Sequence, residues 1–120
     1  MGLDMVAFKT HREIEDHGFQ REDCDIQIQY WRKHPNLHGW MEWLYRMKGG
    51  VEEFNCVGIK IEKEDIDILE KLVLTNELHK TEGFFFGVSQ PEDKELDVEF
   101  ILLARKAIDE GYSIYYSSWW

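Results

Sequence analysis

The segment Tyr30 to Trp40, YWRKHPNLHGW, gathers the side chains best suited to bind a ligand or to carry out chemistry. It holds two imidazoles, two cations and three large aromatic rings within eleven residues. Arg32 and Lys33 stand just before an expected helix, where cationic side chains and free N–H groups both favour an anion. The alternative is a surface ion pair with a neighbouring acid: Asp23, Asp25 or Glu42.

A carboxylate in the first strand could complete a polar site with these residues. Asp4 lies within an apolar pattern, where an ionised carboxylate is costly unless it is paired, and we expect Arg32 or His38 to be its partner. Asp4 and His38 would form an orienting group and a general base if Ser117 or Ser118 supplied a nucleophile nearby. No GxSxG motif surrounds either serine, which favours an ordinary strand role for both.

The candidate ligand-binding residues from the sequence are therefore Asp4, Trp31, Arg32, Lys33, His38, Trp40 and Ser118. A metal site is not expected. His34 and His38 are four residues apart, as two helical metal ligands would be, but Pro35 disfavours a helical backbone at His34. The interpretation that we favour instead is a core or half-buried histidine that hydrogen-bonds a carboxylate. No phosphate-cradling motif of the GxxxxGK[ST] or GxGxxG type occurs, so we expect no nucleotide and no other cofactor.

Hydrophobic periodicity and the positions of Gly and Pro predict the elements that hold these residues. Strands are expected over residues 3–10, around residues 57–61 and over residues 112–119. The expected helices run from Pro35 to the Gly49–Gly50 pair, from about Glu64 to near Asn76, and from a capping box at Ser89 and Glu92 to Gly111. Residues 11–28 are polar, which predicts a long loop or a short frayed helix.

We predict an α+β fold, in which a small, mostly antiparallel three-stranded sheet packs against three helices. The 120 residues should form a single domain, residues 1–120, because one hydrophobic core usually serves ~100 to 200 residues. The GFFFG segment, Gly83 to Gly87, is expected to be a buried turn or a short strand. The terminal YYSSWW aromatics should either close the core or form a homodimer interface through an edge strand.

Charge and composition limit the partners of this domain. The net charge is −10, and residues 51–110 hold sixteen of the twenty-four acidic residues and seven of the fourteen basic ones. Such a chain repels phosphate backbones, so nonspecific nucleic-acid binding is not expected. There is no signal-peptide pattern and no apolar run near the ~20 residues that span a bilayer, so we expect no membrane partner. Cys24 and Cys56 suggest free thiols in a reducing cytoplasm, with one disulfide as the alternative.

The order of several short motifs resembles an uncharacterised family of small bacteriophage and prophage proteins. These motifs are MGLDM at the start, YWRK followed by a His and a Trp on a helix, GFFFG, and YYSSW near the end. The family often has Tyr where this chain has Val6, and an unbroken helix where it has Pro35. The resemblance implies a phage-related protein in the cytoplasm of a host cell, and it implies no established activity.

Three functions remain open from the sequence. The leading hypothesis is a non-catalytic accessory or protein-interaction domain, because no catalytic motif is present and the acidic half of the chain could face a partner. The first alternative is a small enzyme or ligand-binding protein with a polar site around Asp4, Arg32 and His38. The second is an acidic inhibitor that imitates DNA, with the acids of residues 62–70 and 92–99 spread over one surface.

Overall fold

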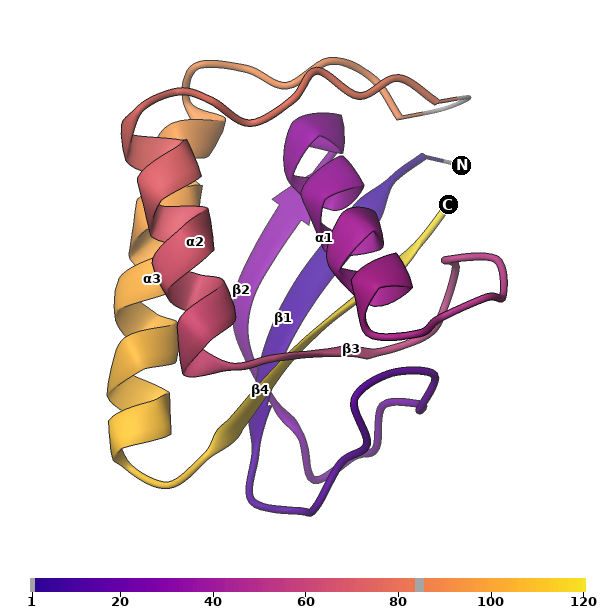
Figure 1. The fold of residues 1–120 in the computed structure, drawn as a ribbon, viewed down its shortest axis with the longest axis vertical. Helices are drawn as coiled ribbons and strands as arrows, with labels where there is room; N and C mark the ends of the chain where they lie inside the picture. The colour runs from indigo at the N-terminus through magenta and orange to yellow at the C-terminus, as the bar shows by residue number, and fades with distance from the viewer. Residues whose placement is uncertain (1, 84–85) are drawn as a thin grey trace.

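Along the chain, two strands are followed by a helix, a strand, two helices and a last strand. The computed structural model describes residues 2–83 and 86–120. The strands are β1 (Asp4–Thr10), β2 (Ile26–Arg32), β3 (Ile59–Ile61) and β4 (Ser113–Trp119), and the helices are α1 (Pro35–Met47), α2 (Lys63–Leu74) and α3 (Asp93–Asp109). The sheet is antiparallel throughout, with the strand order β2-β1-β4-β3 (Figure 1).

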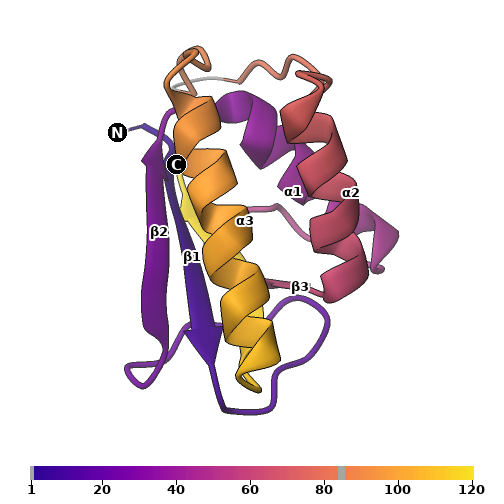
Figure 2. The same ribbon diagram turned by 90° about the vertical axis from the view of Figure 1, so that its left-hand side faces the viewer.

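The three helices lie on one side of the sheet, so the predicted α+β class is confirmed (Figure 2). α1 and α3 pack on the sheet, and α2 packs on α3. The main core lies between these layers and includes fully buried Trp31, Phe100 and Tyr116. α1 starts at Pro35 as expected, because a proline in the first turn has no N–H that a helix would leave unpaired. α3 is followed by Gly111 at φ 90°, a left-handed backbone that suits glycine.

The prediction of three strands is wrong by one strand. β2 begins in the last three residues of the polar stretch 11–28, for which a loop or frayed helix was expected, and continues to Arg32, where no element was expected. It is an edge strand, and Trp31 is its only fully buried residue, so its sequence IQIQYWR lacks a continuous apolar face. A bulge also shifts the register of this pair: Ala7 lies opposite Gln29 and Phe8 opposite Gln27, so Ile28 of β2 is the extra residue. A half-exposed, bulged edge strand leaves little of the two-residue period that identifies strands in a sequence.

The prediction that the C-terminal strand is an edge strand, through which a homodimer could form, is also wrong. β4 lies between β1 and β3 and pairs with both. β4 is therefore an inner strand, and β2 and β3 form the edges of the sheet. Most of the terminal aromatics close the core instead: Tyr116 is fully buried, and the ring of Trp120 lies edge-on to Phe86 at 5.3 Å, whereas Trp119 is exposed.

The expected capping box at Ser89 and Glu92 does not form. α3 starts at Asp93, and its carboxylate accepts a hydrogen bond from the Gln90 N–H at 2.7 Å. Ser89 is used elsewhere, in contacts with His34 and Asn36. Of the GFFFG segment, Phe84 and Phe85 lie outside the described residues, while Phe86 is buried and its N–H donates to the Gly83 carbonyl at 3.1 Å.

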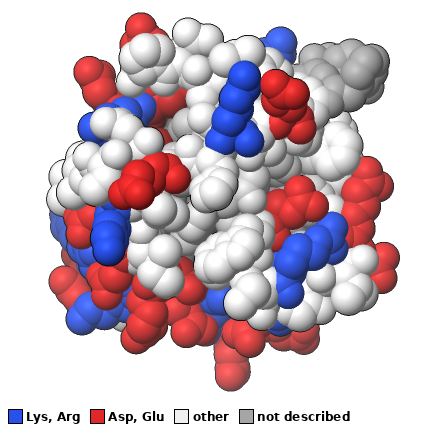
Figure 3. Space-filling view, turned by 45° about the horizontal axis from the view of Figure 1, so that its top comes forward, with Lys and Arg blue, Asp and Glu red and all other residues white. Residues whose placement is uncertain are grey.

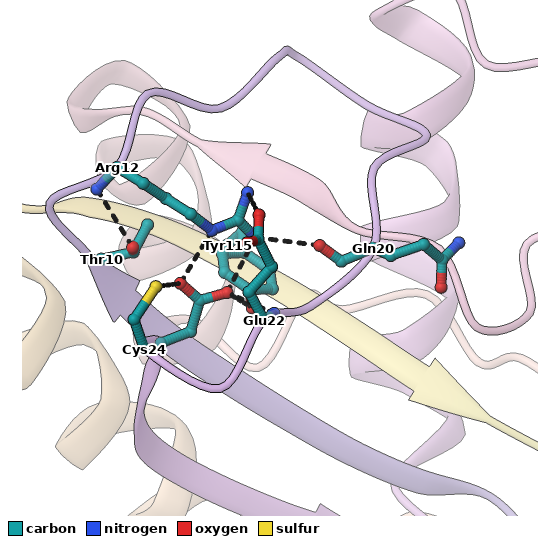
Figure 4. A network of polar contacts seen from close by, with 7 residues as sticks. Thr10, Arg12, Gln20, Glu22, Cys24 and Tyr115 are labelled. Carbon is teal, nitrogen blue, oxygen red and sulfur yellow. Dashed lines mark hydrogen bonds and ion pairs between the residues drawn. The ribbon is translucent and has the colours of Figure 1, made fainter.

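The connection between β1 and β2, residues 11–25, folds over the sheet face opposite the helices. Arg12 forms a bidentate pair with the Asp25 carboxylate, with nitrogen–oxygen distances of 2.9 and 2.8 Å. The hydroxyl of Tyr115 on β4 donates to the same carboxylate. Figure 4 shows Tyr115 beside Arg12 in this network from close by. Burial opposes ionisation, but the hydrogen bonds from Arg12 and Tyr115 outweigh it and hold the pKa of Asp25 well below its usual range. This network closes a second apolar cluster that contains Val6 and Phe8.

We expect Asp25→Asn to lower the free energy of unfolding at pH 7 by about 2 kcal/mol, because the bidentate charge-assisted pair with Arg12 is lost. The contribution of a carboxylate with a lowered folded-state pKa is present above its unfolded pKa and is lost as the pH falls through the folded pKa. Urea denaturation measures the change, and Glu15→Gln, an exposed acid in the same connection, is the control. Equal losses for both variants would contradict the role of the network.

Candidate functional site

Asp4 does not pair with either partner expected for it. Successive β1 side chains point to opposite faces, so Asp4 lies with Val6 on the face away from the helices, whereas Met5 faces the main core. The Asp4 carboxylate accepts a hydrogen bond from the Tyr30 hydroxyl at 2.6 Å. Arg32 lies opposite Asp4 in the ladder, yet no hydrogen bond or ion pair joins the two among the described residues. Asp4 starts the strand and is half-buried, so a single hydroxyl satisfies it.

His38 lies on the other side of the sheet, inside the main core. Its side chain is 1% exposed, and its Nδ1 lies 2.7 Å from the Tyr116 hydroxyl and 3.4 Å from Ser118 Oγ. The structure thus brings His38 and Ser118 together, but Ser118 is as deeply buried as His38. Burial lowers the pKa of His38 to about 4, so the imidazole is neutral at pH 7. A substrate has no access to this pair.

The remaining sequence candidates also lie apart. Trp31 is fully buried in the main core, and Trp40 is 8% exposed on α1. Arg32 and Lys33 are exposed, and the ion pairs expected for them do not form in the described part of the chain. The acids considered as their partners are either exposed or paired elsewhere, Asp25 with Arg12 and Glu42 with Arg46. The predicted residues therefore occupy both faces of the sheet and share no single pocket.

A polar network that the sequence did not predict connects β2, α1 and α3. Buried Asp97 accepts a hydrogen bond from Trp31 Nε1 at 2.9 Å, and its other oxygen lies 2.9 Å from His34 Nε2. His34 Nδ1 lies 2.7 Å from Ser89 Oγ, which also accepts a hydrogen bond from the Asn36 N–H at 3.1 Å. His34, Ser89 and Asp97 line a cavity of about 360 Å³.

One member of this network carried a signal in the sequence. Asp97 falls on the same helical face as Phe100, Ile101 and Ala104, so a carboxylate stands in an apolar stripe and needs partners. His34 and Ser89 had no comparable signal, because they are 55 positions apart and meet only through the tertiary fold. The interpretation favoured over a metal ligand, a core or half-buried histidine that hydrogen-bonds a carboxylate, agrees with the contact between His34 and Asp97.

A second cavity, apolar in character, lies between α1 and α2. It measures about 590 Å³ and is lined by Gly39, Trp40, Trp43, Ile68, Leu72, His79 and Thr81. Trp43 and Ile68 are 46% and 47% exposed, so the groove is open to solvent. Figure 3 shows uncharged side chains gathered in the middle of the face turned to the front and top of Figure 1, with charged side chains around them.

The segment that closes one end of this groove is held firmly. The Thr81 N–H donates to the Asn36 side-chain oxygen at 3.0 Å. A side chain at Gly39 would collide with Thr81, because a Cβ atom there would lie 2.0 Å from the Thr81 hydroxyl oxygen. Glycine at this position therefore lets residues 79–81 pack directly on α1. These contacts fix the wall that residues 79–81 contribute to the groove.

No family model, no curated protein and no solved structure matches this chain. Within the described ranges, no helix is long and apolar enough to cross a membrane. No group of three or more His, Cys, Asp or Glu side chains with the geometry of a metal site occurs among residues 2–83 and 86–120. Cys24 and Cys56 are exposed free thiols, so the disulfide alternative is not formed.

Proposed function

We propose that this protein is an accessory protein-interaction domain that binds an apolar, positively charged helix of a partner protein in the groove between α1 and α2. The observation that carries the proposal is the groove itself, where Trp43 and Ile68 remain about half exposed beside Trp40 and Leu72. The groove contributes binding and no catalysis. We further propose that the protein acts in the cytoplasm of a host cell in a phage-related role. The order of the motifs MGLDM, YWRK, GFFFG and YYSSW supports this part of the proposal.

The size and chemistry of the groove suit this kind of partner. The groove measures about 590 Å³ and is lined by the exposed side chains of Trp43 and Ile68. Tryptophans are the most frequent residues that dominate binding energy at interfaces, and an amphipathic helix places its apolar side chains in such grooves. The net charge of −10 favours a positively charged partner and speeds its association.

Titration with model helical peptides tests the proposal. A peptide of leucine and lysine is compared with one of leucine and glutamate, and the indole N–H signals of the protein are followed by NMR. We expect the lysine peptide to shift the signals of Trp40 and Trp43 and to leave that of buried Trp31 unchanged. Equal binding of both peptides, or shifts that exclude Trp40 and Trp43, would overturn the proposal.

Trp43→Ala should weaken binding of the leucine and lysine peptide about ten-fold or more, because a tryptophan that dominates an interface contributes roughly 2 kcal/mol or more. The matched control is Leu102→Ala, which removes an exposed apolar side chain from α3, away from the groove. This control should leave the dissociation constant unchanged. The same loss in both variants would mean that the peptide binds nonspecifically to exposed apolar surface.

A further inference from the structure

The directions of the hydrogen bonds around His34 follow from the donors and acceptors present. The Asn36 backbone N–H can only donate, so Ser89 Oγ accepts from it and keeps its own proton available. Trp31 Nε1 can only donate, so it occupies one oxygen of Asp97. A neutral imidazole that donates from Nε2 to the other Asp97 oxygen then presents Nδ1 as an acceptor to the Ser89 hydroxyl. The result is a continuous chain from Ser89 through His34 to Asp97.

The surroundings of this hydrogen-bonded network favour proton transfer from the Ser89 hydroxyl to the His34 imidazole. Asp97 fixes the His34 ring and stabilises an imidazolium, as a carboxylate does for a catalytic histidine. Asp93 lies 3.6 Å from His34 Nδ1 and adds a second negative charge beside the ring. The Asn36 N–H belongs to the first turn of α1, where the helix dipole favours negative charge on Ser89 Oγ. His34 and Asp97 are buried, so these interactions act largely out of contact with water.

Ser89 is accessible, in contrast to the buried pair of His38 and Ser118. Its side chain is half-buried and lines the cavity of about 360 Å³ between the start of α1, the end of α2 and the segment before α3. Leu72, Val73 and Leu78 form an apolar part of the wall, whereas Lys94 supplies a cation. The cavity therefore suits a small molecule with a short apolar chain and a polar or negatively charged group.

We propose that Ser89 is a nucleophile activated by His34 and that the cavity takes a small acyl ester. Ser89 Oγ forms a bond to the acyl carbon while its proton passes to His34 Nδ1. The bond between the acyl carbon and the alcohol oxygen breaks, and the alcohol leaves with that proton. Water then attacks the acyl-serine with His34 again as the base, which releases the acid and restores the hydroxyl. Asp97 is a positioning residue in this scheme.

A fluorophosphonate probe tests the nucleophile directly, because attack by an activated serine displaces fluoride and leaves a covalent phosphonate on the oxygen. The full-length protein is treated with the probe, and the adduct is located by intact mass and peptide mapping. We expect one adduct per chain, on Ser89. The Ser113→Ala variant, which removes another half-buried serine, should retain it, and Ser89→Ala should lose it. No adduct, or an adduct at another residue, would overturn the proposal.

Two further variants separate an activated nucleophile from a serine that only caps α1. His34→Gln should slow labelling about 100-fold or more, since a general base typically contributes ~10²–10⁴-fold. Ser89→Cys, made with Cys24→Ser and Cys56→Ser, should react with iodoacetamide at least ten times faster than exposed Cys24 of the unmodified chain. A thiol at position 89 that reacts more slowly than Cys24 would overturn the proposal. Both measurements are independent of the α1–α2 groove, so binding and reactivity can fail separately.

Discussion

Asp97→Ala is expected to lower the free energy of unfolding by about 3–5 kcal/mol, the largest effect we expect from a single substitution in this protein. Asp97 is 2% exposed and accepts hydrogen bonds from Trp31 and His34, which come from β2 and from the residue before α1. Removing the carboxylate leaves two buried donors without an acceptor, and each such group costs about 1–3 kcal/mol. Urea denaturation at pH 7 measures the loss.

The control for Asp97 is Glu99→Ala, which removes an exposed acid two residues along the same helix. We expect it to change the free energy of unfolding by less than about 0.5 kcal/mol, as is usual for surface substitutions. Asp97→Asn should fall between the two, because an amide oxygen still accepts from Trp31 while the charge is lost. A loss below about 1 kcal/mol for Asp97→Ala would mean that water replaces the carboxylate and that the network adds little to the fold.

Several acidic residues of α2 and α3 form ion pairs or hydrogen bonds within the domain. Arg105 of α3 bridges Asp67 and Glu70 of α2, with nitrogen–oxygen distances of 2.8 and 2.9 Å. Lys48 lies 2.8 Å from Asp65, and Asp97 is buried. A DNA-mimic surface requires many free carboxylates on one face. Several of the acids in residues 62–70 and 92–99 are engaged inside the domain, so this alternative has less support than the groove.

The sequence predicts the helices and the inner strands well because these elements bury one regular face. In α1, Leu37, Met41 and Leu44 recur at helical spacing, and Pro35 marks the start. β1 and β4 are flanked on both sides in the sheet, and each has a run of consecutive buried residues, Met5 to Phe8 in β1 and Ile114 to Tyr116 in β4. β2 escapes prediction because its exposed edge position requires few apolar residues and because a bulge at Ile28 interrupts its two-residue period.

The candidate sites are harder to predict because they depend on contacts between distant segments. The sequence singled out Trp40, but the groove beside it is also lined by Trp43, Ile68 and Leu72, whose exposure becomes visible only when α1 and α2 are placed. The cluster YWRKHPNLHGW drew attention to His38 and away from His34. Within that cluster the chain direction changes at Lys33, where φ is 56°, so neighbouring side chains end up in different environments. Residues that are close together in this segment of the sequence therefore do not form one site.

Between pH 6.5 and pH 4, the protein should lose about 3 kcal/mol of stability through His38 alone. Burial lowers the folded-state pKa of His38 to about 4, whereas an unfolded histidine titrates near its ordinary value of about 6.5. In that range the unfolded chain binds more protons than the folded one, so stability falls as the pH falls. The contribution is fully present above pH 6.5. The polar neighbours of the ring, Tyr116 and Ser118, are neutral and provide no charge to stabilise an imidazolium.

Urea denaturation of the unmodified protein and of His38→Asn at pH 7, 6 and 5 tests this dependence. Protonation of Asp25 also lowers the stability of the protein, but only at lower pH. Measurements at pH 5 and above therefore exclude the effect of the Asp25 network. The unmodified protein should lose about 2 kcal/mol from pH 7 to pH 5, and the asparagine variant should lose markedly less, whatever its stability at pH 7. An equal slope in both proteins would show that His38 takes up a proton in the folded state, which requires water to enter the core beside Tyr116.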